Sequence, residues 1–597
     1  MSGIICYGKV DSNLSQTDFE EIATNSFVGR QSHQVKSENT FVLSSIIATP
    51  GSCASKATCK ESRLTVMVDG YFIQTLDQQL TSAEWFLNTY KQYKESCFGK
   101  LNGSYNILII DEESEEITLV SDRYGTRPLV YAESSVGFAI SYSSDLLVGI
   151  GVIEKKLNEN LVANALSFSR VWYNDETFYQ GVKCLKGGSI LKWSKKQSVR
   201  VSKFPVHKLY QNEKPSISKL ASIFKEVISD FQNVPNLGIS LSGGLDSRIL
   251  LASGFSGSSF TWGYRLENDE IQLAKQCADT AKIPWSFIQL TPEDFLDINC
   301  QGDLLREGLD LFVQSYGLKA YQEVSNSGIT GLMTGLALDA TLAGSYNPKH
   351  IDEASLAKVK DFAFSRMEYF DPCLREKLLR SSHIKSRIEN IESEVTNYIV
   401  DNYKENNAFS SISDFFFEHR VRRCIFQRQF WQRAFVEDYI PTFDNRLVDY
   451  IELFSLEERT EHKVFRELLL ELNSDLADID YQGTNIPPSV PVKYWAEATR
   501  LEQEKETLTR KIFFESKGKC YVPYNRYYSN FDEWLRVNES WKNEVQRLLL
   551  SDDSLILNYL NKQELSNMIK DQFSGSSCHY GRIVVLMSLE KTLRLFS

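Results

Sequence analysis

The chain has 597 residues, of which 42% are hydrophobic and 24% charged, and its formal net charge is -12. A single core rarely grows to this length, so we expect two or more domains. The acidic balance argues against a nucleic-acid partner, because contacts to phosphates need a basic surface. The 11 cysteines show no C-x-x-C spacing, which argues against a disulfide framework and against a zinc site.

The chain start, MSGIICYGKVDSN, carries no basic stretch followed by a long apolar one. A secretory signal peptide is therefore not expected. No run approaches the roughly 18 apolar residues that a membrane span needs. We expect a cytoplasmic protein without a membrane partner.

Residues 1–205 are expected to form a first domain of short strands. Runs of β-branched and aromatic residues, broken by Gly, Asn and Asp, predict strands at 64–69, 105–110, 117–120 and 136–140. One helix is predicted from about Ser82 to Glu95. The polar, proline-containing stretch 204–215 is interpreted as a linker.

Residues 206–597 are expected to form a second domain. A helix at 217–231, an apolar strand at 237–241 and a helix at 247–252 alternate, which predicts a parallel sheet covered by helices. From residue 354 onward the sequence predicts an almost wholly helical part, with long amphipathic helices at 374–403 and 492–513.

The sharpest motif stands between that strand and the helix after it, at Leu241-Ser242-Gly243-Gly244-Leu245-Asp246-Ser247. Its glycines and serines allow backbone N–H groups to converge on an anion, and the helix N-terminus adds partial positive charge. Asp246 stands where a carboxylate can hold a phosphate-bound Mg²⁺. The motif lacks the lysine of the kinase and GTPase loop and resembles the SGGxDS loop of the ATP pyrophosphatase family. A plain Gly-Ser turn is the alternative.

Two later segments extend the resemblance to asparagine synthetases. Residues 332–339 (LMTGLALD), with Gly344-Ser345-Tyr346, resemble the family segment SGEGSDELFGGY. This resemblance implies that Gly335 helps to bind the nucleotide and that Asp339 lies opposite Asp246 as a second Mg²⁺ ligand. A structural aspartate at 339 is the alternative.

Residues 436–448 (VEDYIPTFDNRLV) and 462–467 (HKVFRE) resemble the family segments VEARVPFLD and KxxLRE. The resemblance implies that Lys463 stabilises the charge that grows on phosphorus and pyrophosphate. The family lysine lies four residues before the arginine, a position held here by His462, so the register is shifted by one. Glu437 is assigned to orienting or deprotonating the attacking amine, with a structural ion pair as the alternative.

The first half resembles the glutaminase half of the same family through MSGIICYG, residues 101–105 (LNGSY) and residues 121–129 (SDRYGTRPL). The implied fold is an α+β sandwich of the N-terminal-nucleophile type (αββα). It would be followed by an α/β ATP pyrophosphatase domain with a large helical C-terminal part.

Four positions depart from a working glutaminase. Ser2 stands for the nucleophilic cysteine, Leu43 for the arginine that holds the glutamine carboxylate, Asp69 for the oxyanion-stabilising asparagine, and Ser82 for the aspartate that binds the amine. Loss of all four predicts that glutamine is not hydrolysed, as in β-lactam synthetases.

The sequence therefore predicts an amide ligase that depends on ATP and Mg²⁺, forms AMP and pyrophosphate, and works through an acyl-adenylate in specialised biosynthesis. Its partners would be a small-molecule or peptide carboxylate and an amine, and a homodimer is possible. Leu336 replaces the Glu of asparagine synthetases and the Tyr of β-lactam synthetases, which argues against both of their products. Two alternatives stay open: an asparagine synthetase that uses ammonia, or glutamine through Ser2, and a catalytically silent homologue.

Overall fold

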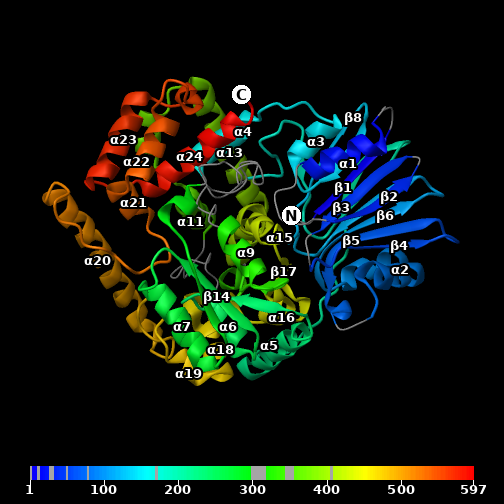
Figure 1. Ribbon diagram of the computed structural model, residues 1–597, viewed down its shortest axis with the longest axis horizontal. Helices are drawn as coiled ribbons and strands as arrows, with labels where there is room; N and C mark the ends of the chain where they lie inside the picture. Colours follow the sequence, from blue (N-terminus) through cyan, green and yellow to red (C-terminus); the bar gives the residue numbers. More distant parts are fainter. Residues whose placement is uncertain are drawn as a thin grey trace.

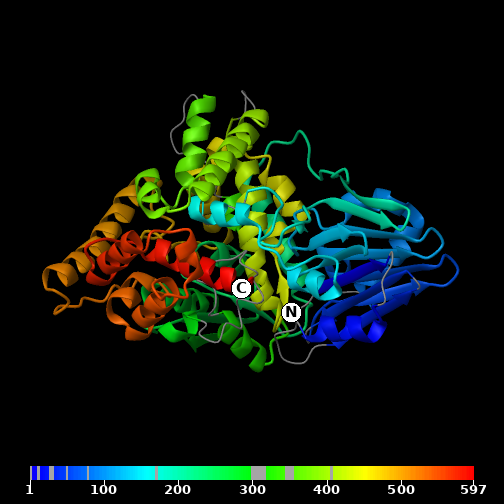
Figure 2. The ribbon, with the colours of Figure 1, turned by 90° about the horizontal axis from the view of Figure 1, so that it is seen from above.

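The computed structural model describes residues 3–9, 14–25, 33–39, 41–48, 51–76, 79–168, 173–296, 317–342, 355–403 and 408–597. Ser2 and Gly344-Ser345-Tyr346 fall outside the described residues. A half rich in strands and a larger half rich in helices lie side by side (Figures 1 and 2). In the part of the chain that the structure describes, no helix combines the length and apolar character of a membrane span.

The first half contains two six-stranded antiparallel sheets. One has the strand order β10-β8-β9-β1-β3-β2 and the other β12-β11-β7-β6-β5-β4. The four strands predicted from sequence are confirmed as β5, β6, β7 and β9. The strands are β1 (Gly3–Lys9), β2 (His33–Asn39), β3 (Val42–Ala48), β4 (Ser55–Cys59), β5 (Leu64–Phe72), β6 (Gly103–Asp111), β7 (Glu116–Ser121), β8 (Val130–Ser134), β9 (Gly137–Ser141), β10 (Lys183–Cys184), β11 (Ser189–Ser194) and β12 (Gln197–Lys203).

Helices cover the outer faces of these sheets. The predicted helix α2 (Ser82–Tyr93) packs on β4 and β5, and a reciprocal cap between Thr81 and Glu84 fixes its start. Helices α1 (Gln16–Asn25) and α3 (Ser144–Ile150) pack on the other sheet. Side chains of both sheets, among them Met67 and Phe138, share one core. Every residue of β5 is buried because both faces of that strand are covered.

The second half is built on a five-stranded parallel sheet with the order β15-β14-β13-β16-β17. The predicted parallel sheet is confirmed, and so are the helix at 217–231 (α5) and the strand at 237–241 (β13). The elements are β13 (Leu237–Ser240), β14 (Ser258–Gly263), β15 (Trp285–Gln289), β16 (Gly331–Met333), β17 (Glu437–Tyr439), α5 (Ile217–Phe231), α6 (Asp246–Ala252), α7 (Asp269–Ala281) and α18 (Lys463–Leu472). The predicted linker lies between the end of β12 and the start of α5, and the boundary drawn near residue 205 stays a prediction.

The expectation of an almost wholly helical part from residue 354 onward is confirmed for the described residues, which contain one short strand there. Strand β17 lies inside this region. The sequence did not predict it, because two adjacent acidic residues are typical of an exposed segment, whereas Glu437 and Asp438 are buried. The amphipathic stretch at 374–403 is helical as expected and forms two helices, α12 (Pro372–Leu378) and α13 (Ser382–Asp401). The break occurs where the Ser381 side chain caps α13. Helix α20 (Trp495–Glu515) confirms the helix predicted at 492–513.

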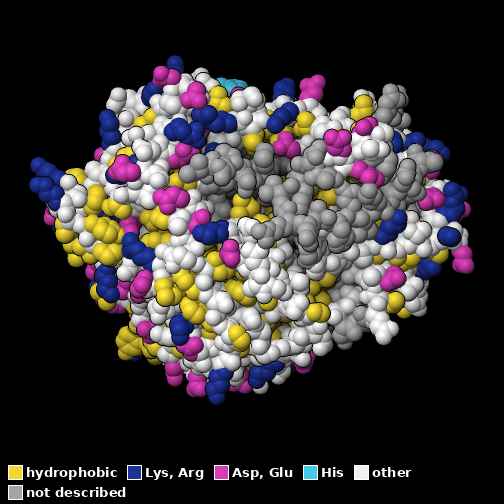
Figure 3. Space-filling model, in the orientation of Figure 1, with side chains coloured by type: hydrophobic (Ala, Val, Ile, Leu, Met, Phe, Trp, Pro, Cys, Tyr) yellow, Lys and Arg dark blue, Asp and Glu magenta, His cyan; other side chains and the backbone are white. Residues whose placement is uncertain are grey.

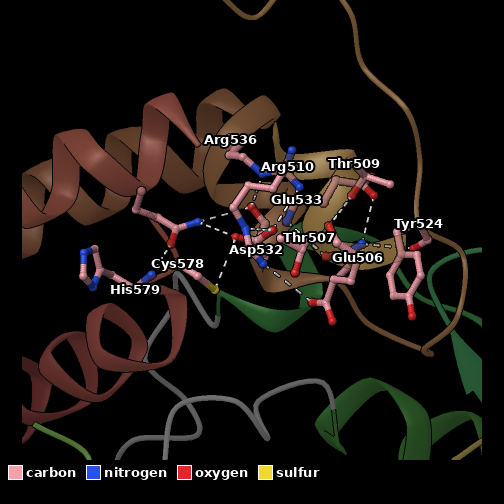
Figure 4. Close-up of polar contacts among 12 residues, drawn as sticks. Glu506, Thr507, Thr509, Arg510, Tyr524, Asp532, Glu533, Arg536, Cys578 and His579 are labelled. Carbon is pink, nitrogen blue, oxygen red and sulfur yellow. Dashed lines mark hydrogen bonds and ion pairs between the residues drawn. The ribbon is translucent and has the colours of Figure 1, made fainter. Parts of the chain in front are cut away.

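A buried polar cluster ties the C-terminal helices together (Figure 4). The Asp532 carboxylate, on α21 (Phe531–Val537), accepts hydrogen bonds from Arg536 at 3.0 Å and from Gln572 at 2.8 Å. Arg510 of α20 also donates to Asp532, at 3.4 Å, and Gln572 belongs to α23 (Lys562–Ser574). One carboxylate therefore joins three helices.

The surface mixes charge and apolar side chains. On the face drawn in Figure 3, basic and acidic side chains are interspersed. On α20, Leu501, Leu508 and Phe514 are exposed. The expectations of a possible homodimer and of no nucleic-acid partner stay predictions.

Candidate active site

The candidate site lies where the strand order of the parallel sheet reverses. From β13 the chain moves outward through β14 and β15, then returns on the other side of β13 as β16 and β17. The chain therefore leaves the carboxyl ends of β13 and β16 in opposite directions, and in open α/β sheets ligands bind at such a reversal of the strand order. The loop 241–245 and α6 follow β13, whereas residues 334–337 and α10 (Leu338–Thr341) follow β16.

The loop after β13 is organised by its own serines. Ser247 Oγ accepts a hydrogen bond from the Ser242 N–H at 3.1 Å, and Ser242 Oγ accepts one from the Gly244 N–H at 3.2 Å. Burial alternates along the loop: Ser242, Gly244 and Asp246 are half-buried, whereas the residues between them are buried. The three half-buried residues therefore form the accessible side of the loop, in front of a helix N-terminus.

Neighbouring segments hold the loop in place. The Gly243 carbonyl accepts hydrogen bonds from Arg248 Nη2 and from the Gln482 N–H, each at 3.2 Å. Arg248 is fully buried and also donates to the Ile479 carbonyl at 2.7 Å. A Cβ at Gly243 would lie 2.9 Å from the Glu270 carbonyl oxygen, so no larger residue fits there without movement.

The structure brings together the two aspartates that the sequence singled out. The Asp339 N–H donates a hydrogen bond to the Asp246 carboxylate. Burial, together with the nearby Asp339 charge, raises the pKa of Asp246 well above its usual range. Gly335 makes this approach possible, because a Cβ there would lie 2.7 Å from the Asp246 carbonyl carbon.

This carboxylate pair suits Mg²⁺. The ion takes one or two protein carboxylates and fills its other positions with water and phosphate oxygens. Within the described residues, no cluster of three or more His, Cys, Asp or Glu side chains forms a fuller metal cage. Two adjacent aspartates beside a phosphate-binding loop are therefore a fitting set of ligands for a metal that arrives with its nucleotide.

Tyr481 is a site residue that sequence reasoning missed. Burial, with the negative charge of Asp246 and Asp339, raises its pKa to about 12. Its ring packs against Trp495 with the ring centroids 5.5 Å apart and the planes tilted by 35°, and the N–H of the next residue, Gln482, donates to the Gly243 carbonyl. The segment DYQGTN carries no recognisable motif, so nothing in the sequence marked this tyrosine.

The backbone conformation at the start of α18 distinguishes His462 from Lys463, the two residues that could match the family lysine. Glu461 and His462 both adopt left-handed conformations, with φ of 56° and 58°, and α18 begins at Lys463. The His462 ring packs against Trp495 at 5.7 Å. Lys463 is exposed at the first position of the helix. The His462 ring thus packs on Trp495, whereas the Lys463 side chain is exposed. The role of Lys463 in stabilising charge on the phosphates stays a prediction.

Leu336 lies against an aromatic cluster rather than among polar groups. The cluster includes Tyr124 from the first half, with Phe426 and Phe443 from the second. Leu336 is half-buried and follows directly on Gly335. An acyl or amine group bound beside Leu336 would thus meet an apolar wall.

Glu437 lies in a buried ion pair with Arg127. This arrangement agrees with the alternative expectation of a structural ion pair and not with a role as a base. Arg127 Nη2 donates to Glu437 Oε1, and Arg127 Nη1 lies 3.1 Å from Asp69 Oδ1. Although burial opposes ionisation, the Arg127 guanidinium holds the pKa of Glu437 below its usual range. The Cys53 N–H also donates to Glu437, at 3.1 Å. A charge that is paired and buried in this way is poorly placed to take a proton from an amine.

The segment 121–129 of the first half makes polar contacts with the second half. The buried Asp122 carboxylate accepts hydrogen bonds from the N–H groups of Tyr124, Gly125 and Thr126. This turn directs the neighbouring arginines across the interface. Arg123 Nη2 bonds Asp449 at 2.7 Å, and Arg127 reaches β17.

Of the positions at which the sequence departs from glutaminases, the structure places Leu43 in the core of β3 and Asp69 against Arg127. Ser82 is buried at the start of α2, with Thr75 Oγ1 at 3.2 Å. A cavity of about 420 Å³ opens beside Ser82, between the two halves. Within the described residues its lining is uncharged and rich in hydroxyl groups, and it includes Ser52, Tyr71 and Tyr439.

The two halves define a two-part enzyme, in which an antiparallel two-sheet domain is joined to a parallel-sheet domain with a phosphate-binding loop. Residues 75–204 match the family described as "Glutamine amidotransferase domain", and residues 229–475 match "Asparagine synthase". The chain belongs to the asparagine synthetase family and is a carbon–nitrogen ligase, an ATP-dependent amide synthetase.

Solved structures with similar regions include one titled "Structure of the allosteric regulatory enzyme of purine biosynthesis". It shares 10% identity over 49% of this chain and 69% of its own, with a TM-score of 0.24. Another is a glutamine phosphoribosylpyrophosphate amidotransferase from B. subtilis with ADP and GMP, at 11% identity over 61% of this chain and 88% of its own, also with a TM-score of 0.24. No curated protein matches the chain.

Proposed function

We propose that the protein joins a carboxylate to an amine through an acyl-adenylate, releases AMP and pyrophosphate, and takes its amine without hydrolysing glutamine. The observation that carries this proposal is the contact between Gly335 and Asp246, which brings Asp339 beside the phosphate-binding loop. A pair of carboxylates kept together at a cost in burial and repulsion makes physical sense where a cation neutralises both.

Each part of the site has a task in this reaction. The N–H groups of the loop 242–247 would receive the β- and γ-phosphates, and Asp246 with Asp339 would hold Mg²⁺. When bound, Mg²⁺ would polarise the phosphoryl oxygens and neutralise the leaving pyrophosphate. The substrate carboxylate would attack the α-phosphorus, with Lys463 stabilising the added charge. An amine would then displace AMP from the acyl carbon.

The apolar wall at Leu336 supports an acyl or amine substrate that is larger or less polar than aspartate or ammonia. The Leu336 side chain can neither accept a proton nor form a salt bridge with an ammonium ion, and the side chains packed beside it are apolar or aromatic. A product outside the asparagine and β-lactam classes, made in specialised biosynthesis, fits this wall.

The cavity beside Ser82, whose described lining residues are all uncharged, supports the absence of glutamine hydrolysis. A zwitterionic glutamine needs one group for its carboxylate and another for its ammonium ion, and burying either charge unpaired is costly. The nearby Asp69 charge is already paired with Arg127. The first half then serves as a docking partner that positions β17.

The test is ATP–pyrophosphate exchange with pooled carboxylates, followed by mass spectrometry of the adenylated species. Exchange that depends on one carboxylate class and on Mg²⁺ supports the proposal. If no carboxylate supports exchange while ATP still binds, the chain is a silent homologue and the proposal is wrong.

A further inference from the structure

A second cavity lies between the two halves, on the far side of the molecule from the phosphate-binding loop. Its opposite walls are α4 (Glu159–Ser167) of the first half and α13 of the helical part. Both helices lie at the upper edge of Figure 1, whereas α6 lies in the lower part. The cavity has a volume of about 230 Å³ and shares no lining residue with the candidate active site.

One buried amide in this cavity has an unmet need for hydrogen bonds. Asn164 is 3% exposed, and neither its Oδ1 nor its Nδ2 has a hydrogen-bond partner among the described residues. A buried amide without partners costs free energy. Native proteins usually satisfy such a group with ordered water or with a ligand, and Asn164 lines a cavity large enough for one.

The rest of the lining offers mainly acceptors. Glu176 accepts hydrogen bonds through Oε2 from Asn158 at 3.0 Å and from Asn160 at 3.2 Å, which leaves Oε1 available. Glu394 lies at the rim and has no salt bridge to a described residue. The Glu176 charge acts on Glu394, which places the two carboxylates near each other.

Arg387, the one cationic side chain among the described lining residues, already has hydrogen-bond partners. Arg387 Nη1 donates to Asn160 Oδ1 at 2.6 Å, Nε donates to His383 at 2.9 Å, and Nη2 lies 3.4 Å from Glu159. Behind the lining, the buried Arg423 guanidinium donates to the carbonyl oxygens of Asn174 and Glu176. The side chains of the described lining itself comprise two carboxylates and one committed guanidinium, so they carry more negative than positive charge. An anionic ligand is therefore disfavoured, and a cationic one is favoured.

We propose that this cavity binds a small molecule with a primary ammonium group, held by Glu176 and Glu394, whose second polar group bonds the Asn164 amide. The ammonium ion supplies three donors where the lining supplies acceptors. The proposal is independent of the ligase reaction, because none of these residues belongs to the phosphate site.

The test measures binding to the full-length protein by calorimetry, with putrescine as the probe and 1,4-butanediol as its neutral counterpart. Saturable putrescine binding, with no measurable binding of the diol, is expected. Glu394→Gln should weaken putrescine binding by about 10-fold or more, since a charge-assisted hydrogen bond is lost. Glu389→Gln, on the same helix but outside the cavity, should leave it unchanged.

Asn164→Leu separates a ligand site from a merely polar pocket. The substitution replaces the unpartnered amide with an apolar group of similar size, so the folded protein should be at least as stable and should bind putrescine more weakly. The proposal is overturned if putrescine does not bind, if the diol binds equally well, or if Glu394→Gln and Asn164→Leu both bind like the wild type.

Discussion

Replacing Gly335 with alanine tests the geometry of the active site most sharply. The new Cβ would lie 2.7 Å from the Asp246 carbonyl carbon and 2.8 Å from the Ser247 backbone nitrogen. Ordinary contact begins at 3.4 Å, so the loop and the segment after β16 would have to part by about 0.7 Å. Both neighbours are backbone atoms at a helix start, which cannot rotate away as a side-chain end could.

The expected effect on catalysis is larger than the effect on the fold. A displacement near 1 Å at a reacting centre costs on the order of 10²-fold in rate. Overpacking of this kind costs about 1–3 kcal/mol of unfolding free energy. We therefore expect Gly335→Ala to stay folded and to lose about 10²-fold in ATP–pyrophosphate exchange.

Gly254→Ala is the matched control. Gly254 follows α6 with φ of 103°, and nothing lies within 4 Å of its Cβ position. An alanine there strains the backbone and lowers stability by about 1 kcal/mol, without touching the loop. If Gly335→Ala keeps wild-type exchange, or if Gly254→Ala loses as much, the contact does not set the geometry of the site.

Three further predictions concern named side chains. Asp246→Asn and Asp339→Asn should each abolish Mg²⁺-dependent exchange with an unchanged circular dichroism spectrum, and near-normal exchange in either would remove its metal role. Lys463→Ala should slow AMP formation by about 10²-fold while His462→Ala costs little, and the opposite result would assign the charge to the histidine. Burial raises the pKa of Asp438 to about 7. The folded state thus holds a proton that the unfolded state releases, and unfolding titrations should show stability falling from about pH 4 to 7. This fall should disappear in Asp438→Asn.

Features encoded by adjacent residues could be predicted from the sequence. The SGGLDS loop fixes its own turn through hydrogen bonds among Ser242, Gly244 and Ser247, so six neighbouring residues contain the information. Helix α5 and strand β13 could be predicted in the same way. The apolar residues of α5 recur with the spacing of one helix face, and β13 is a short apolar run.

Features that depend on distant partners could not be predicted. Arg127 and Glu437 are 310 residues apart in the sequence. Only the folded interface shows that the Glu437 carboxylate binds Arg127 and is not free for a substrate amine. Strand β17 could not be predicted for the same reason, since the partners of its buried acidic residues are distant or outside the strand. Glu437 pairs with Arg127 of the first half, and Asp438 accepts hydrogen bonds from Gln429 and Gln432. The place of Tyr481 beside the loop could not be predicted either, because it depends on the hydrogen bond between Gln482 and Gly243, which no motif in the segment signals.

The most direct test of the account is one reaction followed for two products. The purified protein, with ATP, Mg²⁺, glutamine and the carboxylate found by exchange, is assayed for AMP and for glutamate, with and without an added amine. The account predicts amide and AMP only when the amine is added, and no glutamate in either case. Glutamate released in step with AMP, and abolished by Ser2→Ala, would show that the first half is a working glutaminase and would contradict the account.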